Sequence, residues 1–590
     1  MSQPLENKRH TLAHLLAKAV SDLYPHAKLT LGPAIDNGFY YDIDFSAGEA
    51  PGDDDLKNIQ KGMRKMLSQW TSFEHREVSA DEALELYKDN PYKSELIKEI
   101  SEKGETITLY TAGVGTKAEF TDLCRGGHTE NPAEEISADS FKLDKIAGAY
   151  WRGDEKNPML TRIYGLAFET KDELDVYLAQ LEEAKKRDHR KLGKELGLFS
   201  FSELVGPGLP LWSAKGTTLR HLLDEFVTGL RRDKGYECVT IPHIAKKSLY
   251  ETSGHWDLYG EDLFKVHAKE GEGHDEYVLK AMNCPHHTQI FDSVPRSYKN
   301  MPQRFAETTM VYRAEQSGEL SGLTRVLSIT QDDAHVFCRE TQLREEMEAI
   351  WDIVNDFYGA FDFKLKVRLS FHDPENQEKY LGDSAIWTET EAMMKQIAEE
   401  RDAEYFIGIG EASFYAPKLD FMAYDSIGRE HQVATIQLDR LMPERFDLSC
   451  VNEQGEKERV VMIHAAIAGS LERFLAVLIE HLDGKFPVWL SPTQVAIIPV
   501  AETHNEYATK VYEKLKSIGL RVELDDSSDS MGKKIRKAKQ DRLPYFLVIG
   551  DKEMENKNVT VESRNGESEQ KSVNAFANHV LAEIENRSLN

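Results

Sequence analysis

A pair of strand-like runs within residues 304–338 constrains the fold of this chain more than any other segment. The first run, RFAETTMVY, leads into a polar stretch that contains Gly318 and Gly322, and the second run ends in QDDAHVFC. Two β-type runs separated by a Gly-containing polar stretch are typical of an antiparallel hairpin. The segment therefore predicts two neighbouring strands of an antiparallel sheet.

Arginine side chains at both ends of the predicted hairpin loop indicate what the hairpin could bind. Arg313 and Arg325 flank the loop, and Glu315 follows the first arginine. A guanidinium group presents a planar fork of donors that suits phosphate or carboxylate. The two arginines either converge on one anion or belong to a solvated surface hairpin, and this segment alone leaves both interpretations open.

Two other segments favour the anion site. Residues 460–474, VVMIHAAIAGSLERF, read as an apolar strand, a Gly-Ser turn and a helix with Arg473 in its first turn. A turn of small residues lets a ligand approach the backbone, and the start of a helix favours an anion. Residues 226–244 read as an amphipathic helix that continues into a strand and reaches Pro242.

The order of these elements resembles motifs 1, 2 and 3 of the class II aminoacyl-tRNA synthetases. The segments AMNCPHH, TQDDAHVFC, GEASFYAPKLDF, TIQLD and VMIH make the chain similar to the threonyl-tRNA synthetase family, from about residue 8 to the C-terminus. Each motif is weak singly, and together they are specific. The alternatives are a sister synthetase for proline or histidine, which would not need the metal ligands below, and an RNA-binding regulator, which would not need the motif arginines.

Size, charge and cysteine usage bound the class of protein. The 590 residues are too many for one core, so three or four domains are expected. The sequence has no apolar run of about 18 residues, no signal-peptide core and no C-x-x-C pair among its five cysteines, which predicts a cytoplasmic protein. The net charge of −28 disfavours nucleic acid, but basic stretches at 183–196 and 531–542 are either solvated helix faces or local RNA contacts.

The expected fold class is multidomain, mixed α+β and α/β, around an antiparallel class II catalytic sheet. The expected parts are an α+β editing domain at 1–170, a helical linker at 171–200, the catalytic domain at 201–488 and an α/β anticodon-binding domain with a largely parallel sheet at 489–590. Many family members carry a small ubiquitin-like domain before the editing domain. Because this chain starts near the editing helix, that domain is expected to be absent.

The resemblance implies that the catalytic domain activates L-threonine with ATP and transfers the threonyl group to tRNA(Thr). The carboxylate attacks the α-phosphate in line, so the site must neutralise charge and align both reactants. Arg313 is expected to bridge the carboxylate and the α-phosphate, Glu315 to hold the adenine side, and Arg325 to reach the γ-phosphate. Arg473 and Lys418 complete the implied catalytic set.

The resemblance also implies the groups that surround the two substrates. Gln432 and Thr435 are expected beside ATP, which Mg²⁺ accompanies. Asp333 is expected to accept from the amino group of threonine. The other residues implied for the threonine pocket are Met282, Gln331, Tyr415 and Gln437. Departures from the family pattern that could alter ATP affinity occur at Gln316, Leu327, Ala434 and Ala465.

Three residues far apart in sequence become a metal site only through the resemblance. Read singly, Cys284, His335 and His464 are a buried cysteine and two hydrogen-bonded histidines. The resemblance implies that they hold one Zn²⁺ per subunit and leave a fourth position open for the amino and hydroxyl groups of threonine. Valine, which lacks the hydroxyl, would be rejected. His286 and His287 compete with Cys284 as ligands, and Cys284 is favoured.

A second cluster of histidine and cysteine lies near the N-terminus. Residues 7–23 predict a helix whose leucine-rich stripe leaves His10 and His14 on the opposite side, as an exposed face, a metal pair or a catalytic pair. The segment TDLCRGGH places Cys124 and His128 four residues apart. Together the two pairs resemble the editing domain shared by threonyl- and alanyl-tRNA synthetases, although four such ligands would also suit zinc.

The resemblance implies a metal-independent cleft that hydrolyses mischarged seryl-tRNA(Thr). Serine keeps the hydroxyl that zinc recognises and lacks one methyl group, worth about 1–3 kcal/mol, so binding alone does not exclude it. The implied editing residues are His10, His14, Lys93, Asp122, Cys124 and His128. Activation of water by His10 is a hypothesis.

The C-terminal domain is expected to read the anticodon. Arg536, Glu553 and Arg564 match positions that contact bases, since arginine pairs with guanine edges and a carboxylate accepts from base amino groups. Glu562 stands where the family has an arginine. The resemblance also implies a homodimer, with the first motif at the dimer interface.

Overall fold

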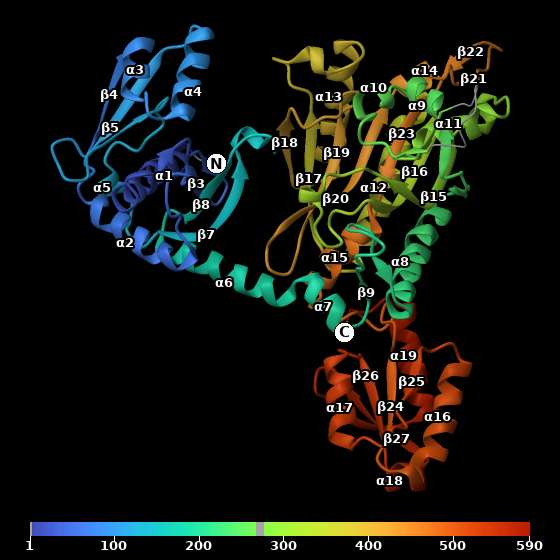
Figure 1. Cartoon of the computed structure of the whole chain (residues 1–590). Helices are drawn as coiled ribbons and strands as arrows, with labels where there is room; N and C mark the ends of the chain where they lie inside the picture. The colour runs from blue at the N-terminus through green and yellow to red at the C-terminus, as the bar shows by residue number, and fades with distance from the viewer. Residues whose placement is uncertain (1–2, 267–275, 590) are drawn as a thin grey trace. The chain divides into compact units, whose positions relative to one another are not determined.

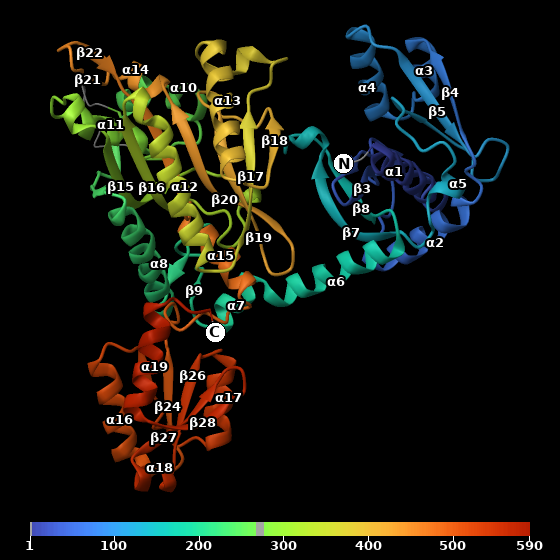
Figure 2. The same ribbon diagram turned by 180° about the vertical axis from the view of Figure 1, so that it is seen from behind.

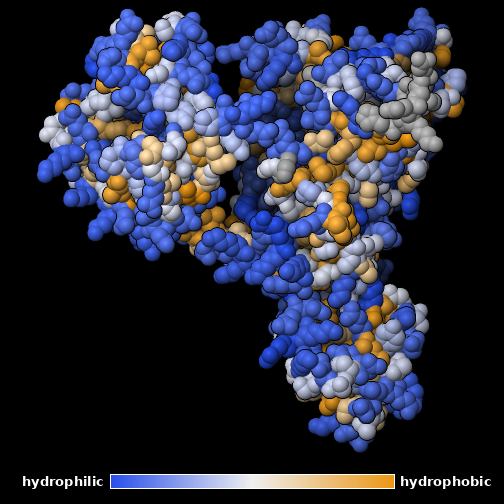
Figure 3. All heavy atoms as spheres, viewed as in Figure 1, coloured by the Kyte–Doolittle hydropathy of each residue, from blue (hydrophilic) through white to orange (hydrophobic). Residues whose placement is uncertain are grey.

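The computed structural model of the chain describes residues 3–266 and 276–589. It forms two compact units, Met1–Glu182 and Glu183–Asn590, which are described separately (Figures 1 and 2). Hydrophilic residues cover most of the surface visible in Figure 3, as expected for a chain in which 29% of the residues are charged. Among the described residues, no helix has both the length and the apolar character needed to cross a membrane.

The first unit contains two sheets with helices packed against them. The larger sheet follows the order β1 (Lys28–Leu29), β3 (Gly38–Asp44), β8 (Met159–Ala167) and β7 (Phe141–Tyr150), with β2 (Ala34–Ile35) paired to β3. Its core is shared with α1 (Gln3–Leu23) and α2 (Leu56–Leu67). The smaller sheet joins β4 (Phe73–Val78), β5 (Ile107–Ala112) and β6 (Phe120–Leu123), beside α3 (Ala80–Leu86) and α4 (Pro91–Glu102). A short α5 (Pro132–Glu135) follows β6.

Helix α1 is buried on two sides. The predicted stripe through Leu12, Leu16 and Val20 packs into the core of the unit. The side that carries His14 is covered as well, and His14 retains only 3% of its exposure. An exposed histidine face, one of the three alternatives for this helix, is therefore wrong for His14, because the segment after β6 lies over it.

The second unit is built around an eight-stranded sheet. Its order is β11 (Glu237–Cys238), β15 (Gln303–Tyr312), β16 (Ser328–Cys338), β23 (Val461–Ala466), β20 (Glu430–Asp439), β19 (Lys418–Tyr424), β17 (Lys364–Phe371) and β18 (Tyr405–Ile409). The edge pairs β11–β15 and β17–β18 are parallel, and the internal pairs are antiparallel. The predicted hairpin is the β15–β16 pair, in which Phe305 faces His335.

Helices cover the main face of this sheet. The helices α8 (Ala214–Asp233), α12 (Leu343–Gly359) and α15 (Leu471–His481) contribute to one large apolar core with the sheet. Helix α15 begins where the Ser470 side chain accepts a hydrogen bond from the backbone N–H of Arg473. The strand expected after α8 is reduced to the two residues of β11, because the chain leaves the sheet edge before Pro242.

The other elements of this part surround the sheet. The remaining helices are α9 (Lys247–Ser253), α10 (His255–Tyr259), α11 (Cys284–Asp292), α13 (Ser384–Glu400) and α14 (Leu441–Arg445). The remaining strands are β9 (Phe199–Ser200), β10 (Leu211–Trp212), β12 (Ile244–Lys246), β13 (Lys265–Val266), β14 (Tyr277–Leu279), β21 (Ser449–Val451) and β22 (Lys457–Arg459).

The C-terminal part is a five-stranded sheet flanked by helices. Its order is β25 (Val522–Leu524), β24 (Val495–Pro499), β26 (Tyr545–Ile549), β27 (Asn558–Ser563) and β28 (Ser568–Ser572). Its helices are α16 (Asn505–Ser517), α17 (Met531–Gln540), α18 (Asp551–Asn556) and α19 (Val573–Glu585). The expectation of a largely parallel sheet is wrong for β27 and β28, which pair antiparallel. The connection from β26 to β27 is too short for the crossover of about a dozen residues that parallel strands require.

The charged helical stretch between the two units is two helices. Helix α6 (Lys171–Arg187) and helix α7 (His189–Glu195) are separated by Asp188. The Asp188 side chain accepts a hydrogen bond from the backbone N–H of Arg190, which caps the start of α7. Because α7 buries His189 and Leu192, the basic run at 183–196 is more than a solvated helix face.

Candidate functional site

The central sheet brings the three predicted zinc ligands together. Strands β16 and β23 are neighbours, and their register places His335 directly opposite His464. Cys284 is the first residue of α11. Ligand atoms of all three side chains lie within 4.8 Å of one another. Long-range strand pairing thus assembles a cluster that spacing in the sequence does not reveal.

The geometry and surroundings of the three side chains fit a tetrahedral metal ion. His335 Nε2 and His464 Nδ1 are 3.1 Å apart. Two nitrogens bound tetrahedrally at zinc distances are separated by about 3.3 Å. Outer partners hold the opposite ring nitrogens, since His464 Nε2 lies 2.9 Å from Asp439 Oδ2 and His335 Nδ1 lies 2.7 Å from His287 Nδ1. Such partners orient metal-bound histidines and fix their tautomers.

Burial sets the protonation of this cluster. Burial raises the pKa of the Cys284 thiol well above its usual value and lowers the pKa of His335 well below its own. The imidazole is therefore neutral, as a metal ligand requires, whereas a thiolate at this position needs an adjacent cation. A donor set of this kind suits a bound metal better than it suits an isolated buried thiolate.

Residues predicted for the threonine pocket surround the cluster. Asn283 donates a 3.0 Å hydrogen bond to Asp333, which also lies 3.7 Å from His335 Nε2. The Tyr415 hydroxyl donates to Gln437, and the Tyr415 ring centroid is 5.7 Å from that of His464. Gln331 faces Thr309 within the β15–β16 pair.

A cleft of about 380 Å³ reaches Met282, two residues before Cys284. Its walls include Met282, Arg313, Glu315 and Arg325. Arg325 is paired with Glu315 at 2.7 Å and with Glu319 at 3.0 Å, so a phosphate that binds Arg325 must displace these carboxylates. The structure therefore places both hairpin arginines at one cavity.

Gln432 and Thr435, predicted near the nucleotide, and Lys418, predicted for the catalytic set, converge on a residue that the sequence did not suggest. Gln432 and Thr435 donate hydrogen bonds of 3.0 and 2.8 Å to Asp420 Oδ1, and Lys418 Nζ lies 3.3 Å from Oδ2. Burial opposes ionisation of Asp420, but Lys418 and several hydrogen bonds hold its pKa below the usual value. Asp420 thus orients this group. Arg473, in contrast, is exposed in the first turn of α15.

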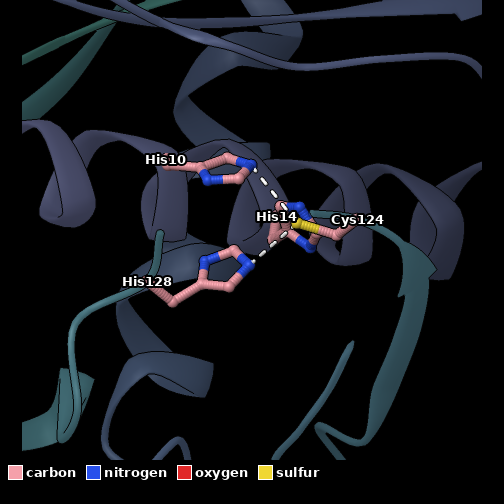
Figure 4. A group of neighbouring side chains, drawn as sticks. All are labelled: His10, His14, Cys124 and His128. Carbon is pink, nitrogen blue, oxygen red and sulfur yellow. Dashed lines mark hydrogen bonds between the residues drawn. The ribbon is translucent and has the colours of Figure 1, made fainter. Parts of the chain in front are cut away.

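The second cluster lies beside the middle of α1, which carries His10 and His14 (Figure 4). The Cys124 sulfur is 3.2 Å from His128 Nε2 and 3.7 Å from His10 Nε2. The rings of His10 and His128 are stacked with centroids 4.4 Å apart, and His14 meets both edge to face. Ligand atoms of all four residues also lie within 4.8 Å of one another. A cleft of about 340 Å³ opens beside His10, His14 and Cys124.

A buried ion pair forms another wall of this cleft. Lys93 Nζ and Asp122 Oδ1 are 2.7 Å apart, with both side chains about 3% exposed. The Tyr41 hydroxyl donates a 2.6 Å hydrogen bond to Asp122. Tyr41 is a site residue that the sequence did not suggest, because it is one of several aromatic residues in an ordinary strand. The six residues predicted for this site are therefore close together.

Burial also determines the charge state of this second cluster. It lowers the pKa of His10, His14 and His128, so their rings are neutral near pH 7. Burial raises the pKa of Cys124 to about 11, so its thiol stays protonated. A neutral imidazole at the mouth of a cleft can accept a proton from water.

The three predicted anticodon residues differ in availability. Arg536 is exposed on α17. Glu553 already accepts hydrogen bonds from the backbone N–H of Gly550 and the hydroxyl of Thr560. Arg564 donates to the backbone oxygen of Phe486, and burial lowers its pKa to about 10. Of the three, Arg536 is the side chain free to meet a base.

Comparison with known proteins defines the class first. Residues 264–482 match the family described as "tRNA synthetase class II core domain (G, H, P, S and T)", and residues 494–583 match "Anticodon binding domain". The fold and the two matches together define a class II aminoacyl-tRNA synthetase. A Giardia lamblia prolyl-tRNA synthetase structure, 16% identical with a TM-score of 0.54, shares the fold.

Full-length relatives define the family. The chain is 48% identical to "Threonine--tRNA ligase" of Porphyromonas gingivalis over 98% of this chain and 87% of that protein. It is 46% identical to the ligase of the same name from Deinococcus radiodurans, over 99% and 89%. A Cryptosporidium parvum structure, titled as the RNA binding domain of threonyl-tRNA synthetase, is 36% identical with a TM-score of 0.63, over 67% of this chain and 98% of that chain. The chain belongs to the threonine–tRNA ligase family.

Proposed function

We propose that the chain activates L-threonine with ATP and transfers the threonyl group to tRNA(Thr). The observation that carries this proposal is the convergence of Cys284, His335 and His464 beside a cleft that contains Arg313 and Arg325. The cluster accounts for the choice of amino acid, and the arginines account for the phosphates. Family membership supports both parts of the reaction.

The three ligands would hold one Zn²⁺ per subunit. When bound, the ion supplies an open position for the amino and hydroxyl groups of threonine. Asp333 accepts from the amino group, and Tyr415 and Gln437 close the pocket. Valine is rejected because it leaves these polar partners unpaired.

The motif arginines align ATP with the amino acid. Arg313 neutralises the charge that develops between the carboxylate and the α-phosphate, and Arg325 and Arg473 hold the outer phosphates with Mg²⁺. Glu315 contacts the adenine side. Asp420 keeps Lys418, Gln432 and Thr435 in place beside the nucleotide.

The first unit removes serine from mischarged tRNA by hydrolysis. His10 accepts the proton of the attacking water, since its ring is neutral and lies at the cleft. The buried Lys93–Asp122 pair and Tyr41 fix the opposite wall. His14, Cys124 and His128 shape the pocket without a metal.

The remaining assignments follow the same scheme. We assign residues 1–170 to editing, 171–200 to the linker, 201–488 to catalysis and 489–590 to anticodon binding. Arg536 contacts an anticodon base, and Glu553 and Arg564 must exchange their present hydrogen bonds to do the same. The enzyme works as a cytoplasmic homodimer.

Amino-acid-dependent ATP–pyrophosphate exchange and metal analysis test the proposal together. We expect ATP–pyrophosphate exchange with threonine, at most weak exchange with serine, and no exchange with valine, proline or histidine. Metal analysis should find one zinc ion per chain. Exchange that depends on proline or histidine, or threonine exchange in metal-free protein, would overturn the assignment.

A further inference from the structure

The junction of α6 and α7 is tied to two catalytic elements through one side chain. His189 is the first residue of α7 and is 5% exposed. Its ring Nδ1 lies 2.7 Å from Glu480 Oε1, near the end of α15. Its Nε2 lies 3.1 Å from the backbone nitrogen of Leu323, in the loop between β15 and β16. The ring thus joins the linker, helix α15 and the hairpin loop.

The partners of the ring define its protonation state. A backbone N–H can only donate, so Nε2 accepts the hydrogen bond from Leu323. The hydrogen of the neutral ring is then on Nδ1, which donates to Glu480. The backbone N–H of His189 also donates to the same carboxylate oxygen at 2.9 Å. Both ring nitrogens are occupied, so this cluster of Asp188, His189 and Glu480 has no nitrogen left for a metal.

Glu480 is itself fixed from the other side. Its Oε2 lies 2.6 Å from Arg429, which also pairs with Asp425 at 2.6 Å. Arg187, the last residue of α6, donates a 2.8 Å hydrogen bond to Ser426 in the same turn. The end of α15 is therefore held in a polar network that includes both helices of the linker.

The hairpin loop is packed closely against the ring. Leu323 is fully buried, and Arg325 follows two residues later. Gly322 has a φ of +48°, and an added Cβ would lie 2.3 Å from His189 Nε2. A side chain at this position would both strain the backbone and push the imidazole away from Leu323. The contact therefore depends on glycine at position 322.

We propose that His189 is a positioning residue for ATP. It sets the loop that carries Arg325 against α15, the helix that carries Arg473, so that both guanidinium groups face the same phosphates. The inference rests on the proposed function, because it takes these arginines to be phosphate ligands. It assigns to the linker a role in the synthetic reaction, in addition to joining two units.

Two variants separate the two hydrogen bonds of the ring. In His189→Asn the amide N–H replaces the donor at Nδ1, while the acceptor for Leu323 is lost. In His189→Gln the amide oxygen replaces the acceptor at Nε2, while the donor to Glu480 is weakened. Lys194→Gln, a change of an exposed residue on the same helix, is the matched control.

The KM for ATP in threonine-dependent exchange is the first readout. We expect His189→Asn to raise it about tenfold, because the buried N–H of Leu323 is left without a partner. The KM for threonine should stay unchanged in all variants. In His189→Gln and Lys194→Gln, the KM for ATP should stay within about twofold of the wild-type value, a smaller change than the loss of a buried hydrogen bond causes. Gly322→Ala should resemble His189→Asn. Equal KM values for ATP in the Asn and Gln variants would overturn the proposal, as would a parallel rise in the KM for threonine.

Hydrogen exchange of the Leu323 amide is the second readout and requires no catalysis. Exchange should be faster in His189→Asn than in the wild type and His189→Gln, without a matching change in the amides of α12. Unchanged exchange in the Asn variant would refute the contact. If the wild type showed no threonine-dependent ATP–pyrophosphate exchange, the proposed function would be wrong. Hydrogen exchange of the Leu323 amide would still test whether His189 holds the hairpin loop.

Discussion

The two histidine–cysteine clusters are built from the same residue types and have different surroundings. In each, nitrogen and sulfur atoms from distant segments lie within 4.8 Å of one another. In the core cluster, Asp439 and His287 hold the outer ring nitrogens of His464 and His335. In the N-terminal cluster, His10 Nδ1 is 3.3 Å from the backbone oxygen of Gly127, and His14 Nδ1 has no hydrogen-bond partner among the described residues.

The two clusters differ in the partners of the side chains rather than in the types of side chain. A carboxylate behind an imidazole raises its basicity and fixes its orientation, which favours a bound cation. The N-terminal cluster has its carboxylate, Asp122, engaged by Lys93 and Tyr41 instead. Its rings are neutral because burial lowers the pKa of His10, His14 and His128, and a neutral imidazole suits proton transfer. The same residue types therefore fit the proposed zinc site in one unit and the proposed hydrolytic cleft in the other.

The largest expected effect is the loss of the core ligand in Cys284→Ser. A serine hydroxyl does not replace a thiolate as a zinc ligand, so bound zinc should be lost, and threonine-dependent exchange should fall more than about 100-fold, beyond the range for outer partners. Metal analysis and ATP–pyrophosphate exchange measure the two effects. Hydrolysis of seryl-tRNA(Thr) should be unchanged. Full exchange activity in a zinc-free variant would contradict the zinc site.

The reciprocal change is His10→Ala in the first unit. Loss of a general base should slow hydrolysis of seryl-tRNA(Thr) about 100-fold or more. Single-turnover deacylation measures the rate, with His75→Ala, an exposed histidine outside the cleft, as the matched control. Threonine-dependent exchange and zinc content should match the wild type. A deacylation rate equal to that of the control would remove His10 from the mechanism.

A smaller effect is expected when an outer partner of the core cluster changes. In Asp439→Asn the amide can keep the Oδ1 contacts to the backbone of Leu441 and Met442 but cannot accept from His464 in the same way. Zinc affinity should fall about 10- to 100-fold. Competition titration with a chelator measures it, with the exposed Asp447→Asn as control. An unchanged affinity would show that the outer carboxylate does not distinguish the two clusters.

The smallest effect concerns the pH dependence of editing. Burial lowers the pKa of His10, so the neutral base persists at pH values where an ordinary histidine, with a pKa near 6.5, is already protonated. The rate of seryl-tRNA hydrolysis should therefore stay level as the pH falls to 6.5 and decline only below it. A pH–rate profile under single-turnover conditions measures the midpoint. A midpoint above 6.5 would be inconsistent with the proposed base.

Much of the architecture could be predicted because its signals are local. The β15–β16 hairpin and the strand–turn–helix around Arg473 follow from short apolar runs and glycine positions. The direction of β27 was predicted wrongly, because it depends on the length of the preceding connection. The burial of His14 was missed because the residues that cover α1 lie more than 100 positions away.

The sequence allowed the residues of each site to be predicted, but not how their side chains are arranged in space. Resemblance supplied Cys284, His335 and His464, and strand pairing explains why the two histidines meet. Asp420, Asp439 and Tyr41 carry no distinctive local signal, since acidic and aromatic residues are common in such strands. His189 was hidden in a basic run, whose composition suggested solvent rather than a buried hydrogen-bond network.

The pairing of β16 with β23 has a consequence for translation. Along β16, Ala334 and Val336 point into the large apolar core, while His335 points to the opposite face. A shift of the register by one residue would reverse these sides and bury an imidazole among hydrocarbon side chains. A chain with this register would not fold stably, so it could not select any amino acid, correct or incorrect. Under the proposed function, the accuracy of amino-acid selection at this point of the molecule depends on the same forces that fold the sheet.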